Sequence, residues 1–190
     1  METILISTLL VAIAEIGDKT QLLAIVLTAR FRKPVPIILG ILCATVANHL
    51  LAAAGGYFIA DLLKGFWFQI GVSLAFIAMA AWTLVPDKMD DDTELHDGTS
   101  AFLATLVAFF FVEIGDKTQI ATVALAARFH SVALVATGTT LGMLLADIPA
   151  VLLAEKATEI VPLTYVRAAA AAIFLVLGLW GLLGAMGWPG

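Results

Sequence analysis

Cysteine and histidine are scarce in this chain of 190 residues, which has one cysteine, Cys43, and three histidines. A single cysteine has no partner within the chain, so an intrachain disulfide is excluded. We expect Cys43 to be a small core residue inside an apolar segment. Zinc and copper sites rely on thiolate and imidazole ligands, and the sequence has no cluster of either kind. Any metal chemistry must therefore use oxygen-bearing side chains.

Charge is sparse as well. Charged residues make up 13% of the chain and hydrophobic residues 62%, whereas soluble domains have about 25% and about 45–50%. The sequence has no basic stripe with interleaved aromatic residues, which argues against nucleic-acid binding. The first apolar run follows Glu2 and has no Lys or Arg before it, so it does not fit a secretory signal peptide.

The chain instead contains long apolar runs. A helix that crosses a bilayer needs roughly 20 mostly apolar residues. Six runs approach or exceed this length, at approximately 3–29, 37–60, 66–85, 101–127, 132–154 and 164–187. The sequence therefore predicts an all-α membrane protein with six transmembrane helices.

The heptapeptide EIGDKTQ occurs twice, at 15–21 and, 98 residues later, at 113–119. At the same offset Gly40 matches Gly138, and both belong to small-residue patterns that let membrane helices approach closely. A period of half the chain indicates two homologous halves. The predicted division of the chain is a first repeat at 1–86, an acidic cytoplasmic linker at 87–100 and a second repeat at 101–190.

Each half would contain three spans. Because three is an odd number, the halves must enter the membrane from opposite sides, which makes them inverted-topology repeats. Transporters built in this way hold their substrate near the bilayer midplane, where the repeats meet. Both motifs lie near the middle of their spans, so we expect them to face each other.

Basic residues in short loops set the orientation of a membrane protein. One side of the predicted topology collects most of them: Arg30, Arg32, Lys33, Lys88, Lys156 and Arg167. The other side has Lys64 and Arg128. We therefore expect the first side, with the central linker, in the cytoplasm and both termini outside.

Each motif places a glutamate, an aspartate and a lysine in an apolar run. On a continuous helix Glu15, Asp18 and Lys19 would lie on one side, and Gly17 would admit a local break. Each charge at the centre of a lone membrane helix costs on the order of 2.5–3.5 kcal/mol. These side chains must therefore face each other, water or an ion.

The four motif carboxylates and two lysines leave a formal charge of −2, which one divalent cation or two protons would neutralise. Oxygen ligands suit Mn²⁺, Ca²⁺ and Mg²⁺. The candidate metal ligands are Glu15, Asp18, Gln21, Asn48, Glu113, Asp116, Gln119 and Asp147. Lys19 and Lys117 would balance the charge. His49, the repeat mate of Asp147, is interpreted first as a hydrogen-bonded core histidine and otherwise as a ligand or proton relay.

Other interpretations stay open at this point. Two structural ion pairs, Glu15–Lys19 and Glu113–Lys117, would lock the halves together but would not account for the two aspartates. A passive cation channel would conduct without proton coupling. An intramembrane hydrolase with a carboxylate pair as acid and base is a third possibility, although the sequence lacks the H-E-x-x-H and G-x-S-x-G motifs.

The two EIGDKT segments resemble the doubled E-x-G-D-[KR]-[ST] motif of the MneA-type manganese exporters, a family that includes eukaryotic Golgi Mn²⁺/Ca²⁺:H⁺ exchangers. The resemblance covers nearly the whole chain. It implies export of Mn²⁺, or of Ca²⁺, in exchange for protons, with Glu15, Asp18, Glu113 and Asp116 forming the ion site. It also implies a bacterial inner membrane. We expect membrane lipid and the divalent cation as partners, no bound cofactor, and a monomer or homodimer.

Overall fold

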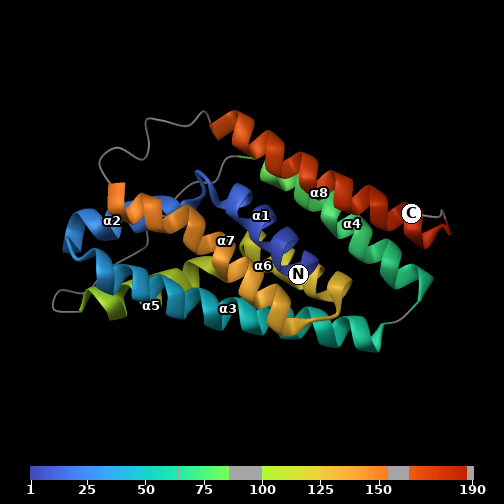
Figure 1. Ribbon diagram of the computed structural model, residues 1–190, viewed down its shortest axis with the longest axis horizontal. Coiled ribbons are helices and arrows are strands. Elements are labelled where there is room, and N and C mark those ends of the chain that lie inside the picture. Colours follow the sequence, from blue (N-terminus) through green and yellow to red (C-terminus); the bar gives the residue numbers. More distant parts are fainter. Residues whose placement is uncertain (64, 86–99, 154–162, 188–190) are drawn as a thin grey trace.

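The computed structural model describes residues 1–63, 65–85, 100–153 and 163–187, which form α-helices and short connections with no strand among them. The helices are α1 (Glu2–Glu15), α2 (Lys19–Phe31), α3 (Pro34–Leu62), α4 (Phe66–Thr83), α5 (Ala101–Glu113), α6 (Lys117–Phe129), α7 (Val132–Leu153) and α8 (Leu163–Ala185) (Figure 1). Four of them, α3, α4, α7 and α8, contain stretches long and apolar enough to cross a membrane. The prediction of an all-α membrane protein is confirmed.

The apolar runs at 3–29 and 101–127 are not single helices. Each is divided at its motif, because α1 ends at Glu15 and α5 ends at Glu113, and the next helix begins four residues later. The expectation that one continuous helix face carries the motif side chains is therefore wrong. Gly17 and Gly115 have φ angles of 78° and 75°, a region that glycine adopts without steric cost.

Each break is closed by the glutamine that ends its motif. The side-chain oxygen Oε1 of Gln21 accepts a hydrogen bond from the Gly17 backbone N–H at 2.8 Å. Gln119 makes the same bond to Gly115, also at 2.8 Å. Asp18 and Asp116 are the N-cap residues of α2 and α6, so the glycine turn delivers each aspartate to the start of the next helix.

The two halves of the chain interleave. Helix α1 packs against α7, and its repeat mate α5 packs against α3, the mate of α7. The contacts repeat in detail, because a Cβ atom placed on Gly40 would lie 2.7 Å from Thr105 Cβ and one on Gly138 would lie 2.7 Å from Ser7 Cβ. Each half therefore buries helices against the other half.

Substitution of Gly40 by alanine is expected to destabilise the protein by about 1–3 kcal/mol, the usual cost of overpacking. The added methyl group would also lie 2.8 Å from the Phe102 carbonyl oxygen, so α3 and α5 would have to separate. Gly55→Ala on the same helix is the control, because nothing lies within 4 Å of its added Cβ. Thermal unfolding in detergent should show a lower midpoint for Gly40→Ala alone, and equal midpoints would contradict the close contact.

Helices α4 and α8 form a pair that breaks the symmetry of the bundle. They pack along each other at one edge of the molecule (Figure 1). The pair contacts the rest of the bundle through α8 on α1 and α4 on α6. Among the described residues no comparable packing joins α4 to α5 or α8 to α2, the contacts that repeat symmetry would require.

Two buried apolar clusters show the same asymmetry. One lies toward the turn at His130 and the other toward the turn at Arg32; we call these the His130 end and the Arg32 end. Five positions correspond between the clusters: Leu10, Ala53, Ala121, Leu125 and Val135 at the His130 end, with Ala108, Val151, Leu23, Leu27 and Ile37 at the Arg32 end. Phe76 and Phe174, from α4 and α8, join only the His130-end cluster. No described residue of either helix joins the other cluster.

Cys43 and the basic loop residues were singled out in the sequence, and the structure describes only some of them. Cys43 is exposed on α3, so its prediction as a core residue is wrong; an apolar helix in a membrane can present a cysteine to lipid. The acidic linker, apart from Ser100, lies outside the described residues. The same holds for Lys64, Lys88 and Lys156, and for the side chain of Arg167.

Candidate cation site

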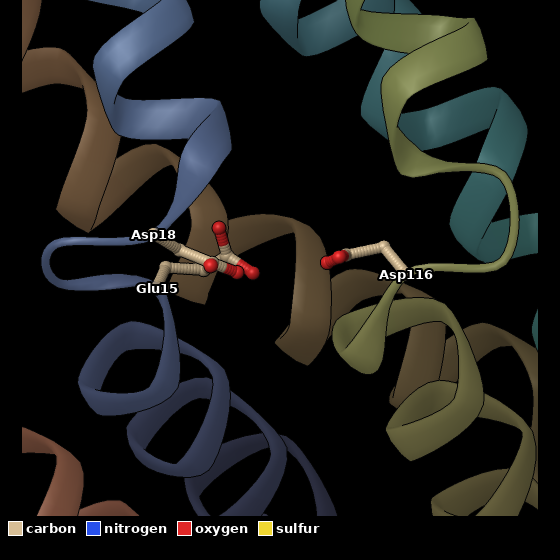
Figure 2. A group of neighbouring side chains, drawn as sticks. All are labelled: Glu15, Asp18 and Asp116. Atoms are coloured by element: carbon tan, nitrogen blue, oxygen red, sulfur yellow. The ribbon is translucent and has the colours of Figure 1, made fainter. Parts of the chain in front are cut away.

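Three carboxylates meet where the two breaks face each other. Glu15 and Asp18 come from the first break and Asp116 from the second, and Figure 2 shows them pointing toward one another across the gap between the two halves. Their exposed fractions are 0%, 5% and 3%. One oxygen from each lies within 4.8 Å of the others. The expectation that the motifs face each other is confirmed for these three residues.

Hydroxyl groups hold Glu15 from both halves. Thr20 Oγ1, five residues along the same motif, donates to Glu15 Oε2 at 2.5 Å. Thr118 Oγ1 from the second motif donates to Glu15 Oε1. Both threonines are buried. Each oxygen of the Glu15 carboxylate is thus oriented by a hydroxyl, and each still has a lone pair that can face an ion.

Lys19 connects the two motifs. Its Nζ lies 3.0 Å from Asp116 Oδ1, so the ion pair joins the first half to the second. This contact joins the two motifs, whereas the structural ion pair considered from the sequence, Glu15–Lys19, lies within one motif. Three carboxylates and one ammonium give the group a formal charge of −2, which matches a divalent cation.

Lys117 is placed differently from its repeat mate. It is buried, and its Nζ donates to the Val85 carbonyl oxygen just beyond α4 at 3.1 Å. The second motif lysine thus contacts the α4–α8 pair, whereas Lys19 contacts the carboxylate group. The two motif lysines therefore make different contacts, and the charge-balancing role expected for both stays a prediction.

The spacing of the three carboxylates suits a hard cation. Calcium–oxygen bonds measure about 2.3–2.6 Å, so two oxygens on one such ion are at most about 5 Å apart. The 4.8 Å limit within the group falls inside that range. Glu15, Asp18 and Asp116 can therefore ligate one ion after small side-chain movements.

Glu113 and Asp147 are buried near this group but are not part of it. Thr45 Oγ1 on α3 donates to Glu113 Oε1 at 2.9 Å. Neither oxygen of Asp147 has a hydrogen-bond partner among the described residues, and neither does Glu113 Oε2. Asp147 interacts electrostatically with Glu113 and Asp18. Glu113 and Asp147 therefore lie outside the three-carboxylate group. Their role as metal ligands stays a prediction.

The amide side chains serve mainly to position other groups. Besides its bond to Gly17, Gln21 donates through Nε2 to the Ala146 carbonyl oxygen at 3.1 Å. Gln119 Nε2 donates to Asn48 Oδ1 at 3.3 Å, and Asn48 Nδ2 donates to the Phe110 carbonyl oxygen at 2.9 Å. All three side-chain oxygens already accept one hydrogen bond, so a second lone pair would have to bind any cation.

Two residues of α3 differ from what the sequence indicated. Neither ring nitrogen of His49 has a hydrogen-bond partner among the described residues, although the side chain is fully buried. It is therefore not the hydrogen-bonded core histidine favoured above. Thr45, which holds Glu113, was not among the predicted site residues. Its position one helical turn before His49 in an apolar run is the signal that would have identified it.

The sequence is similar to proteins of one family. The sequence matches the family described as "Divalent cation/proton antiporter GDT1" over residues 3–91 and 101–188. It is 46% identical over 180 residues to a protein of Vibrio cholerae serotype O1 named "Putative manganese exporter", covering 94% of this chain and 90% of that one. It is 28% identical over 159 residues to GDT1-like protein 4 of Oryza sativa subsp. indica, covering 70% of this chain and 56% of that one.

No solved structure matches the chain. The family match spans both halves and both motifs and leaves out only residues 92–100 at the end of the linker and two residues at each end of the chain. A transporter, rather than an enzyme, is consistent with both the family and the carboxylate group. The chain belongs to the GDT1 family of divalent cation/proton antiporters.

Proposed function

We propose that this protein exports Mn²⁺ from the bacterial cytoplasm in exchange for protons, and that the ion binds to Glu15, Asp18 and Asp116. One observation carries the proposal: three buried carboxylates from the two halves converge with a single ammonium, leaving a formal charge of −2. Burying such a charge without compensation is costly. A divalent cation compensates it in one state, and protons would do so in the other.

Lys19 supports the exchange in this scheme. The ammonium group pairs with Asp116, and an arriving cation would compete with it for the same oxygen. The lysine then moves aside toward solvent, which its partly exposed side chain permits. Lys19 thus limits the charge that protons must neutralise in the return step.

The membrane topology follows from counting each broken pair as one span. Helices α1 and α2, and likewise α5 and α6, are half-helices that together cross the bilayer, which brings the total to six spans in two inverted repeats. Discontinuous helices that meet at the midplane are the form that ion sites take in inverted-repeat transporters. The predicted charge bias would place the Arg32 end in the cytoplasm.

The α4–α8 pair is the moving element of this proposal. Interleaving of α1 with α7 and of α3 with α5 argues against one half rocking as a unit against the other. The pair instead covers only the His130 end, so the site would be accessible from the Arg32 end, where cytoplasmic Mn²⁺ enters. A cavity of about 470 Å³ lies at the His130 end, with Phe76 and Arg128 in its wall, and would receive the ion on release.

A flux measurement in proteoliposomes tests this function. Purified protein should carry Mn²⁺ across the membrane, and uptake should rise when a pH gradient drives protons in the opposite direction. A divalent-sensitive dye inside the vesicles reports the flux, and protein-free vesicles give the background. Flux that ignores the gradient would indicate a passive channel, and no flux for Mn²⁺, Ca²⁺ or Mg²⁺ would overturn the transport proposal.

A further inference from the structure

Met143 on α7 is the repeat mate of Thr45 on α3, and the exchange of hydroxyl for thioether is a chemical difference between the two halves beside the site. Thr45 donates to Glu113 at 2.9 Å. The repeat mate of Glu113 is Glu15, which belongs to the three-carboxylate group. The position that binds Glu113 through a hydroxyl oxygen on α3 therefore holds a sulfur on α7, at the place that corresponds by repeat symmetry to Glu15.

The two helix interfaces are alike enough to transfer this geometry. A Cβ atom on Gly40 would lie 2.8 Å from the Phe102 carbonyl oxygen, and one on Gly138 would lie 2.8 Å from the Ile4 carbonyl oxygen, the repeat mate of that group. Gly40 and Gly138 precede Thr45 and Met143 by the same five residues on their helices. By this repeat symmetry we expect Met143 to face the end of α1 as Thr45 faces the end of α5.

The burial of Met143 points to the same location. Its side chain has an exposed fraction of 0%, yet it belongs to neither of the two apolar clusters of the described residues. It lies one helical turn before Asp147, so the two share a helix face. Because this face carries a buried site carboxylate, we expect the Met143 side chain to lie beside the polar groups of the site.

We infer that Met143 is a specificity-determining residue that favours Mn²⁺ over Ca²⁺ and Mg²⁺ at the Glu15 side of the site. Ca²⁺ takes six to eight oxygen ligands and Mg²⁺ demands an octahedron of oxygens. A thioether beside Glu15 would offer no oxygen to complete such a shell. Mn²⁺ shares the preference of these two ions for oxygen, but as a transition-metal ion it accepts one polarizable thioether among its oxygen ligands more readily than they do. The inference rests on the proposed transport function.

Competition uptake with a volume-conserving variant tests the role of the sulfur. Met143→Leu keeps the packing at small cost but removes the sulfur. We expect the preference for Mn²⁺ over Ca²⁺ to fall about tenfold, within the range that changes around a metal site produce, with Ca²⁺ flux maintained. Inhibition of uptake by Cd²⁺, a softer ion, should weaken in parallel. Met79→Leu is the matched control, since Met79 is a buried methionine of the His130-end cluster on α4.

A second variant, Met143→Thr, restores the hydroxyl that the other half carries and should raise Ca²⁺ uptake relative to Mn²⁺. It also provides the test if Met143→Leu does not fold. Normal Mn²⁺ uptake with an unchanged preference in a folded variant would overturn the inference and leave the transport function intact. Equal losses for both ions would assign Met143 to packing alone. Absence of Mn²⁺ flux in the unmodified protein would instead refute the function itself.

Discussion

Replacing Asp116 with asparagine is expected to reduce manganese uptake into proteoliposomes at least about 100-fold, the upper end of losses seen around metal sites. Asp116 supplies the one carboxylate that the second half contributes to the group, and it also holds Lys19 at 3.0 Å. Asparagine keeps the shape but removes the charge. The group would then carry a formal charge of −1, too little to balance a divalent ion.

Two controls separate this loss from misfolding. Glu2→Gln neutralises an exposed carboxylate at the start of α1 and should leave uptake unchanged. Asp116→Asn should elute from a sizing column as the unmodified protein does, because asparagine can still cap α6. Uptake by Asp116→Asn within about a factor of two of normal would exclude Asp116 as an essential ligand.

Val26→Trp is expected to abolish transport although Val26 is exposed in this structure. Val26 on α2 is 45% exposed, whereas its repeat mate Ala124 on α6 is only 5% exposed, because α4 packs on α6 and, in the part of the chain that the structure describes, α8 makes no comparable contact with α2. If the α4–α8 pair moves to the Arg32 end during transport, α8 must cover Val26. An indole at that position leaves the present state intact and prevents the other state from forming.

Leu103→Trp is the matched control for this experiment. Leu103 is 49% exposed and its mate Leu5 is 60% exposed, so the α4–α8 pair covers this position in neither state. Transport by the Leu103 variant should be close to normal, while the Val26 variant should retain thermal stability and lose flux. Full transport by a stable Val26→Trp protein would show that the pair does not exchange ends.

Much of the fold could be predicted from the pattern of apolar runs. The expected runs at 37–60, 66–85, 132–154 and 164–187 correspond within a few residues to α3, α4, α7 and α8. The two broken helices were harder, because hydropathy does not register a backbone turn. Only the glycine inside each motif signalled it, and glycine is tolerated in continuous helices as well.

The residues of the candidate site could be predicted from the sequence, but not which of them belong to the three-carboxylate group. The repeat identified Glu15 and Glu113 as equivalent, yet only Glu15 belongs to the three-carboxylate group. A difference elsewhere on the chain separates them, since Thr45 binds Glu113 and a threonine of the other motif binds Glu15. Long-range contacts of this kind depend on how α3 and α6 approach the breaks, which no local pattern encodes.

The interleaved packing has a consequence for biosynthesis. Helix α1 leaves the ribosome before α7, but Ser7 is buried in part against Gly138 of α7, which is made more than a hundred residues later. The first half therefore enters the membrane with its packing surface and its motif carboxylate uncovered. Insertion and folding become separate stages, and the nascent first half must wait in the bilayer until its counterpart arrives.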